Sequence, residues 1–275
     1  MGGSAGRAGT LVLVGCGKMG TAMLRGWMAA GVASRFLVIE PAGMPSAIGS
    51  AANVVCYPSA EELPSDCVPD AVVFAIKPQV VDAILPYYCR WADRGALFLS
   101  IVAGKTLAGL TRHLGPTAAI VRTMPNTPAA IGRGITVACA NRFVTVEQRQ
   151  LCDRLLAAIG DSAWVEDEAQ IDAVTAVSGS GPAYVFLLIE TLAQAGEAEG
   201  LPAALALQLA RSTVAGSGEL ARLSDESPAQ LREDVTSPGG TTRAALDVLM
   251  APDGLERLIK RAVAAAAARS RELAS

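Results

Sequence analysis

The residues best suited to chemistry lie in the run from Asp234 to Ala244. Pro238 fixes one backbone φ angle, while Gly239 and Gly240 allow conformations and close approaches that other residues do not. The apolar spacing after Thr242 predicts a helix, so the unpaired amides at its start would face out of the turn. Such amides, together with the positive end of the helix dipole, can bind a small carboxylate. The alternative is an ordinary capped helix start.

A second candidate site is a glycine motif near the start of the chain. The apolar run Leu11–Val14 predicts a buried parallel strand, and a helix is predicted over Thr21–Ala30. Between them, Gly15 suits the tight turn, Gly17 the close approach of a pyrophosphate, and Gly20 the packing of helix on strand. The order predicts a dinucleotide-binding βαβ unit.

The second strand of this unit is predicted over Phe36–Ile39, and it ends in Glu40. A carboxylate at this point would bond a free ribose 2′-hydroxyl and repel a 2′-phosphate. Residues 41–56 contain no Arg or Lys, which favours NADH over NADPH. Both cofactors remain open, because the Glu40 side chain could instead point away behind Pro41.

Further apolar runs predict a continuing sheet. The predicted strands are Ala71–Ile76, Ala96–Val102, Ala118–Met124, Gly134–Ala140 and Ser162–Val165, with a helix over Val146–Ile159. Ligands bind beyond the carboxyl ends of the strands in an open parallel sheet. The strand ends at 77–78, 103–104 and 124–126 should therefore meet at one crevice, although each alone could be a plain loop.

After a charged junction at Glu166–Glu168 the sequence becomes helical. The predicted helices are Gln170–Ala198, Pro202–Leu223, Pro228–Val235, Gly240–Met250 and Pro252–Arg271, with Ser178–Pro182 suiting a kink or a close approach to another chain. The expected fold is an α/β Rossmann-like N-terminal domain followed by an all-α dimerisation domain. The expected boundaries are a flexible tail over 1–9, a dinucleotide-binding domain over 10–166, and a helical domain over 167–275.

Composition limits the partners. The formal net charge is −3 with no cluster of Lys or Arg, so a nucleic-acid partner is not expected. The 6 cysteines have no C-x-x-C spacing and His113 is the single histidine, so we expect no metal site and reduced thiols. We expect no signal peptide and no membrane partner, and a cytoplasmic location. The Ala-rich helices carry few charges, which favours burial between the subunits of a homodimer.

Several separate motifs resemble the pyrroline-5-carboxylate reductase family, almost end to end. They are Val14–Gly20, Ala75–Gln79, Ser100–Gly104, Arg122–Ala129, Ala176–Tyr184 and Leu231–Leu246, of which the last is the most specific. The resemblance implies hydride transfer from NADPH or NADH to the C=N bond of 1-pyrroline-5-carboxylate, giving L-proline. It also implies a helical domain that interlaces two subunits, and often a larger ring of dimers such as a decamer.

The resemblance assigns roles to particular residues. It places the substrate carboxylate on the amides of Gly240, Thr241 and Thr242, in a turn that includes Ser237 and Gly239. The Thr242 hydroxyl would bond the ring nitrogen as an orienter or relay, with water as the proton source. The expected cofactor contacts are Gly15, Cys16, Gly17, Lys18, Met19, Gly20, Glu40, Ala75, Ile76, Lys77, Pro78, Ile101, Val102, Ala103, Met124 and Asn126.

Two residues depart from the family pattern. Cys16 stands where another small residue is common, so its modification could block the cofactor. Asp234 stands where a neutral amide is common, which leaves its cofactor contact open. One rival function is a β-hydroxyacid-type reductase, which uses a lysine on the interdomain helix, but residues 176–192 contain none. The other rival is a nucleotide-binding regulator without catalytic activity.

Overall fold

The computed structural model of this chain describes residues 8–274. The chain divides into two compact units, the first comprising residues up to 179 together with those from 267 onward, and the second comprising 180–266. Most of the predicted N-terminal tail lies outside the described residues. Its last two residues, Ala8 and Gly9, belong to the first strand, which starts earlier than the apolar run suggested.

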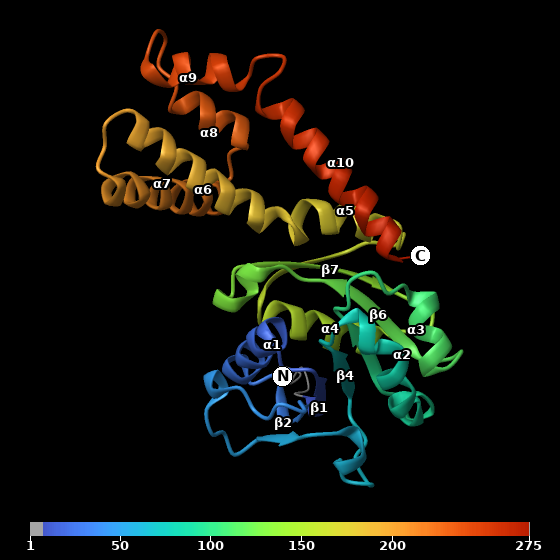
Figure 1. The fold of residues 1–275 in the computed structure, drawn as a ribbon. Helices are drawn as coiled ribbons and strands as arrows, with labels where there is room; N and C mark the ends of the chain where they lie inside the picture. The colour runs from blue at the N-terminus through green and yellow to red at the C-terminus, as the bar shows by residue number, and fades with distance from the viewer. Residues whose placement is uncertain (1–7, 275) are drawn as a thin grey trace, which may run out of the picture. The chain divides into compact units, whose positions relative to one another are not determined.

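The first unit is built on one sheet (Figure 1). Its strands are β1 (Ala8–Val14), β2 (Ala33–Ile39), β3 (Val54–Tyr57), β4 (Ala71–Phe74), β5 (Leu97–Ser100), β6 (Ala119–Met124), β7 (Gly134–Ala140) and β8 (Gly160–Trp164). Their order across the sheet is β3-β2-β1-β4-β5-β6-β7-β8. The order reverses beside β1, where the chain crosses from β3 to β4. In open α/β sheets, this reversal creates a ligand crevice at the carboxyl ends of the strands.

The last two strands depart from the parallel sheet that the sequence predicted. β7 pairs antiparallel with β6, and β8 then pairs parallel with β7. The cause is the length of the connections, because a parallel neighbour requires a long crossover. The link from β6 to β7 holds only the short 3-10 turn Thr127–Ile131, whereas a full helix lies between β7 and β8.

Helices cover both faces of the sheet (Figure 1). They are α1 (Lys18–Ala30), α2 (Val81–Ile84), α3 (Leu107–Leu114) and α4 (Val146–Ala157), with 3-10 turns at Ser46–Ile48, Ala60–Glu62, Pro78–Val80 and Leu85–Arg94. Successive side chains of β1 point to opposite faces, so Leu11 and Leu13 join the core under α1 and α4. Val12 and Val14 join the core under α3 and the turn that follows α2. The Trp27 indole ties α1 to α4 by donating to the Leu155 carbonyl at 2.9 Å.

The first unit ends in a helical segment and also includes the end of the chain. α5 (Gln170–Val174) runs into a π-helical turn at Thr175–Gly179, where small residues had suggested a kink. The Ser270 hydroxyl, near the end of α10 (Leu255–Ala274), donates to the Asp172 carboxylate at 2.6 Å. A hydrogen bond across nearly a hundred residues thus fixes the C-terminal turns to this unit.

The second unit is helical throughout its regular structure. It contains α6 (Gly181–Ala198), α7 (Ala203–Leu223), α8 (Pro228–Asp234), α9 (Thr241–Leu249) and the larger part of α10. Small residues let α6 and α7 approach closely, because a Cβ on Gly196 would lie 3.3 Å from that of Ala206. Much apolar surface stays exposed on α6, including Phe186 and Leu187. The continuous helical stretch Gln170–Ala198 is long and apolar enough to cross a bilayer, which is weak evidence for a membrane span.

Candidate active site

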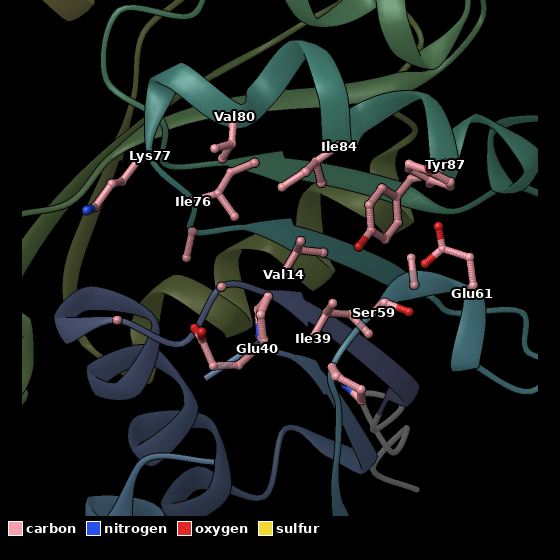
Figure 2. A pocket seen from close by; sticks show the side chains of 17 residues that line it. Val14, Ile39, Glu40, Ser59, Glu61, Ile76, Lys77, Val80, Ile84 and Tyr87 are labelled. Carbon is pink, nitrogen blue, oxygen red and sulfur yellow. The ribbon is translucent and has the colours of Figure 1, made fainter. Parts of the chain in front are cut away.

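A pocket of about 440 Å³ opens at the carboxyl ends of β1, β2 and β4 (Figure 2). It lies at the reversal of strand order, where the topology predicts a ligand crevice. It is lined by Val14, Gly15, Gly17, Ile39, Glu40, Pro41, Pro58, Ser59, Ala60, Glu61, Ala75, Ile76, Lys77, Val80, Ile84, Tyr87 and Tyr88. Most of this lining is apolar, with polar groups at a few positions, as in most sites for small molecules and cofactors.

The glycine loop has the shape required to hold a pyrophosphate. Gly15 has a φ of +87°, and a Cβ there would lie 2.6 Å from the Ala75 carbonyl, so both conformation and space require glycine. Gly17 differs, because a Cβ on it would project into open space beside the pocket. α1 begins at Lys18, three residues earlier than the sequence predicted, and no side chain caps its start. Its first amides are therefore available to an anion.

Glu40 lies at the end of β2 and turns its carboxylate toward the glycine loop (Figure 2). One carboxylate oxygen accepts from the Cys16 amide at 2.8 Å, and the other from the Ala42 amide at 3.2 Å. The side chain therefore lies along the pocket lining, and the alternative that it points away behind Pro41 is wrong. The hydrogen bonds hold the charge between the phosphate loop and the turn after β2.

The far side of the pocket is an apolar slot. Val80 and Ile84 point into it from α2 and the turn before it, and Ile39 faces them from β2 (Figure 2). The Tyr88 side chain is only 1% exposed, and its hydroxyl has no hydrogen-bond partner among residues 8–274. Burial, with the nearby charge of Glu61, raises the pKa of this phenol, so it remains a neutral potential donor. A flat apolar group with polar edges would fit this slot.

The Cys16 side chain lies in the core of the first unit, whereas its place in the glycine motif suggested contact with the cofactor. Its side chain is 3% exposed and packs in the core under α1, with Sγ 3.6 Å from the Thr21 hydroxyl oxygen. Burial raises the pKa of this thiol above its ordinary value. The backbone amide of Cys16 donates to Glu40, which lines the pocket. The Cys16 thiol itself does not line the pocket. Ready modification of this thiol is therefore not expected.

The neighbouring strand ends continue along the same edge of the sheet. The Ile101 amide donates to the Phe74 carbonyl at 3.1 Å, so the segment after β5 lies beside the end of β4. Val102 is buried in the core, and Ala103 is exposed. Asn126 follows β6, and its side-chain oxygen accepts from the Ile135 amide at 2.9 Å. This side chain holds the β6–β7 connection in shape, which gives it a positioning role.

The Ser237–Gly240 turn in the second unit has a defined geometry. The Gly240 amide donates to the Ser237 carbonyl at 3.1 Å, and Gly239 has a φ of +70°. With Pro238 at the second position, these are the features of a type II turn. α9 begins directly after it at Thr241, and no side chain caps the start. A cluster of backbone amides therefore opens from this turn, as the sequence predicted.

Two details of this turn refine the predicted anion site. Because the Gly240 amide is used by the turn itself, the amides of Thr241, Thr242 and Arg243 are those without a partner in the helix. Gly240 has an ordinary φ of −79°, so its need for glycine is steric: a Cβ there would lie 2.5 Å from the Ser237 hydroxyl oxygen. Asp234 points along α8, where it accepts from the Gln230 side chain at 2.7 Å.

Comparison with known proteins shows which family combines these two features. Residues 168–273 match the family model for pyrroline-5-carboxylate reductase dimerisation, and residues 10–104 match the one for NADP oxidoreductase, coenzyme F420-dependent. The pyrroline-5-carboxylate reductase of Pseudomonas aeruginosa is 40% identical over 96% of both chains. The chain belongs to the pyrroline-5-carboxylate reductase family.

Solved structures of the family have the same fold. The pyrroline-5-carboxylate reductase of Coxiella burnetii superposes with a TM-score of 0.89 at 32% identity, covering 98% of this chain and 100% of that one. The pyrroline carboxylate reductase of Plasmodium falciparum, with NADP bound, gives a TM-score of 0.82 at 30% identity, covering 97% and 98%. This chain thus shares the fold of these two reductases, a Rossmann-like domain followed by a helical dimerisation domain, as the sequence predicted.

Within this reductase fold, the pocket brings together only part of the predicted cofactor set. Gly15, Gly17, Glu40, Ala75, Ile76 and Lys77 line it. Outside its lining lie Cys16, Lys18, Met19, Gly20, Pro78, Ile101, Val102, Ala103, Met124 and Asn126. Met19 and Gly20 are parts of α1, and Met19 packs against the core. Met124 packs with the cluster formed by Val137, Cys139 and Ile171.

The wall formed by residues 58–61 together with Val80, Ile84, Tyr87 and Tyr88 was not predicted from the sequence. β3 was not recognised, because its four residues, Val54–Tyr57, are too short to show a period. The loop after β3 nevertheless reaches the pocket, as the parallel pairing of β3 with β2 requires. The aromatic pair Tyr87–Tyr88 was a usable signal, because Tyr side chains combine an apolar body with a polar end.

Proposed function

We propose that this chain reduces the C=N bond of 1-pyrroline-5-carboxylate to give L-proline, the last step of proline biosynthesis, with NAD(P)H as the reductant. The observation that carries this proposal is the Ser237–Gly240 turn at the start of α9. It retains both its glycine conformation and its uncapped amides in a chain that matches reductases of this family over 96% of its length. A regulator without catalytic activity would not need to preserve this turn.

The residues of the first unit would bind and orient the cofactor. The bound reduced nicotinamide supplies the hydride. The uncapped start of α1 and the open side of Gly17 favour the pyrophosphate there, and Lys77 adds a positive charge at the pocket. The segments Ala75–Pro78, Ile101–Ala103 and Met124–Asn126 are proposed to line the nicotinamide half. Their place along one sheet edge supports this, because β4, β5 and β6 are neighbours.

The residues of the second unit would hold the substrate. A carboxylate on the amides at the start of α9 would satisfy donors that the helix leaves unpaired, and the helix dipole adds to the attraction. The family pattern places Gly240, Thr241 and Thr242 here. Because the Gly240 amide is bonded within the turn, the amides of Thr241, Thr242 and Arg243 would hold the carboxylate. Ser237 and Gly239 would act by fixing the turn. The protein's main contribution is then orientation and the exclusion of water.

Thr242 is the side chain proposed to act on the ring nitrogen. It is half-buried and lies one residue into α9. A threonine hydroxyl is a poor acid near neutral pH, so it would orient the imine or relay a proton whose source is water. Its effect should therefore be on the rate of reduction rather than on cofactor affinity.

The expected assembly is a homodimer formed through the helical domain, with five such dimers joining into a decamer. The match to the family's dimerisation model and the exposed apolar side chains of α6 and α7 support the dimer. The same association would cover the apolar stretch Gln170–Ala198 without any membrane. We place the enzyme in the cytoplasm, with the imine and NAD(P)H as small-molecule partners.

The test is turnover with a defined product. Purified full-length protein is mixed with 1-pyrroline-5-carboxylate and either NADH or NADPH, while the reduced-nicotinamide absorbance is followed and proline is measured by amino-acid analysis. Loss of absorbance with matching formation of proline is expected. A six-membered cyclic imine carboxylate is assayed in parallel, to compare the rate of its reduction with that of the five-membered imine. Cofactor binding without proline formation from 1-pyrroline-5-carboxylate would contradict the proposal.

A further inference from the structure

The Glu40 carboxylate is a fixed charge at the mouth of the cofactor pocket. Its two oxygens accept from the amides of Cys16 and Ala42 at 2.8 and 3.2 Å, and these amides belong to the glycine loop and to the turn after β2. A side chain held at both oxygens cannot swing away without breaking both bonds. An ionised carboxylate has about four acceptor positions, so further positions remain for a ligand.

Among residues 8–274, the pocket lining beside Glu40 holds no Lys or Arg suited to a second phosphate. Residues 41–57 carry no Lys or Arg, and the pocket lining adds a second carboxylate, Glu61. The pKa of Glu61 is lowered by hydrogen bonds from its own backbone amide and from the hydroxyls of Ser59 and Tyr87, so it too is charged. Glu40 and Glu61 thus place two negative charges in this part of the pocket lining. Arg90, outside the lining, donates to the Ala60 carbonyl at 3.5 Å, and its charge acts on Glu61.

The cation in the pocket lining, Lys77, lies at a different strand end. It follows β4, and β1 separates β4 from β2 in the sheet. Two strand spacings amount to about 10 Å between the ends of β2 and β4. Lys18 begins α1 and is not part of the lining. Lys77 and Glu40 therefore lie at different strand ends of the pocket (Figure 2), and Glu40 is the one beside a ribose bound at the end of β2.

These positions favour one of the two nicotinamide cofactors. A ribose with free hydroxyls can donate to the remaining acceptor positions of Glu40, which stabilises NADH. A 2′-phosphate would bring about two negative charges against Glu40, with no Lys or Arg of the described pocket lining beside it to compensate. The fold itself does not exclude NADP, because the Plasmodium falciparum relative has NADP bound. The selectivity must therefore come from residues particular to this chain.

We propose that Glu40, fixed by the Cys16 and Ala42 amides, makes this chain selective for NADH over NADPH. This inference rests on the proposed function in that the pocket binds the reductant of the reaction. It does not depend on the identity of the imine. Glu40 would touch the cofactor's ribose and so act as a specificity residue.

The test is equilibrium binding to the full-length protein without any imine, measured by calorimetry. The ligands are NADH, NADPH, AMP and adenosine 2′,5′-bisphosphate, and the last two differ only in the 2′-phosphate and lack the nicotinamide. The wild-type protein should bind NADH at least about tenfold more tightly than NADPH, a difference of about 1.4 kcal/mol. The difference between the NADH and NADPH affinities should become smaller at high ionic strength, because salt screens the repulsion between Glu40 and the 2′-phosphate.

Two substitutions separate charge from structure. Glu40→Gln keeps a side-chain oxygen for one of the two backbone amides and removes the charge, while Glu40→Ser also opens space for a phosphate. Each should shift the NADPH-to-NADH affinity ratio toward NADPH by on the order of tenfold, with the larger shift for serine. The ratio remains informative even if loosening the glycine loop weakens both cofactors equally. Glu61→Gln, in the same pocket, should shift the ratio much less.

The outcomes distinguish this inference from the proposed function. Selective NADH binding in a protein that forms no proline would support the role of Glu40 and contradict the proposed reaction. Equal wild-type affinities for NADH and NADPH, or an unchanged ratio in both Glu40 variants, would overturn the inference while leaving the reaction intact. Failure to bind either cofactor would overturn both.

Discussion

The Arg122 guanidinium lies 2.8 Å from the Glu168 carboxylate, with only 6% of the arginine side chain and 27% of the glutamate side chain exposed. The same carboxylate oxygen accepts from the Leu107 amide at 2.7 Å, at the start of α3. One oxygen thus joins β6, α3 and the segment before α5. These elements flank the strand ends proposed to hold the nicotinamide.

Removing this carboxylate should destabilise the first unit. Glu168→Ala leaves the Arg122 charge buried and unpaired, so we expect the free energy of unfolding to fall by about 3 kcal/mol. Denaturant titration followed by tryptophan fluorescence measures it. Glu166→Ala is the matched control, because Glu166 is 92% exposed and lies 3.9 Å from Arg149. Equal effects of the two substitutions would contradict a structural role for the buried pair.

Thr242→Ala should lower kcat by about ten- to a hundredfold and leave the dissociation constant of the cofactor unchanged. The hydroxyl is proposed to act only on the imine nitrogen, so cofactor binding does not require it. Steady-state kinetics with a separate cofactor titration separates the two effects. Thr242→Ser should retain most of the activity.

The neighbouring residue gives the matched control for this prediction. Thr241→Ala keeps the backbone amide proposed for the carboxylate and removes only an exposed side chain, so its effect should be small. If Thr242→Ala weakened cofactor binding while kcat stayed the same, the role assigned to its hydroxyl would be wrong.

The Cys16 thiol should react slowly with iodoacetamide in the folded protein. Burial raises the pKa of this thiol above 9.0, so the thiolate fraction near neutral pH is smaller than in a free cysteine. Cys89 is exposed and should be alkylated first, and peptide mass spectrometry can follow both sites. In denaturant the two should react alike. Rapid labelling of folded Cys16 at neutral pH would show that its thiol is accessible.

The same shift predicts a dependence of stability on pH. Because the folded thiol has the higher pKa, its contribution is fully present below about pH 9, the ordinary value, and is lost as the pH rises through the folded pKa. Cys56 has a pKa raised mainly by burial and acts in the same direction. Replacing Cys16 by Ser should reduce the alkaline loss of stability in thermal melts recorded across this range.

Introducing charge on α6 should separate the subunits. Phe186 and Leu187 are 59% and 57% exposed, and a homodimer would bury them. The double substitution Phe186→Glu with Leu187→Glu should therefore shift the mass measured by light scattering toward that of the monomer. Val146→Glu is the control, because Val146 is 68% exposed on α4 in the first unit. A double variant that kept the wild-type mass would place the interface elsewhere.

Much of the architecture followed from local sequence features. The run Leu11–Val14 was predictable as a buried strand because every residue in it is apolar. The glycines that follow it predicted a tight turn before a helix. The Pro238–Gly239 pair predicted the turn that opens α9, which has the type II form. Such features are predictable because backbone conformation and short-range hydrogen bonding determine them.

Long-range pairing determined the rest. Nothing in the composition of Gly134–Ala140 shows that it runs antiparallel to β6, because that direction depends on the length of a connection and on the partner available. The wall of the pocket from residues 58–61 comes together only when β3 pairs with β2. The direction of a side chain is equally non-local. The sequence placed Glu40 at the end of a strand, but the Cys16 and Ala42 amides, which the fold brings to its carboxylate, direct that charge along the pocket.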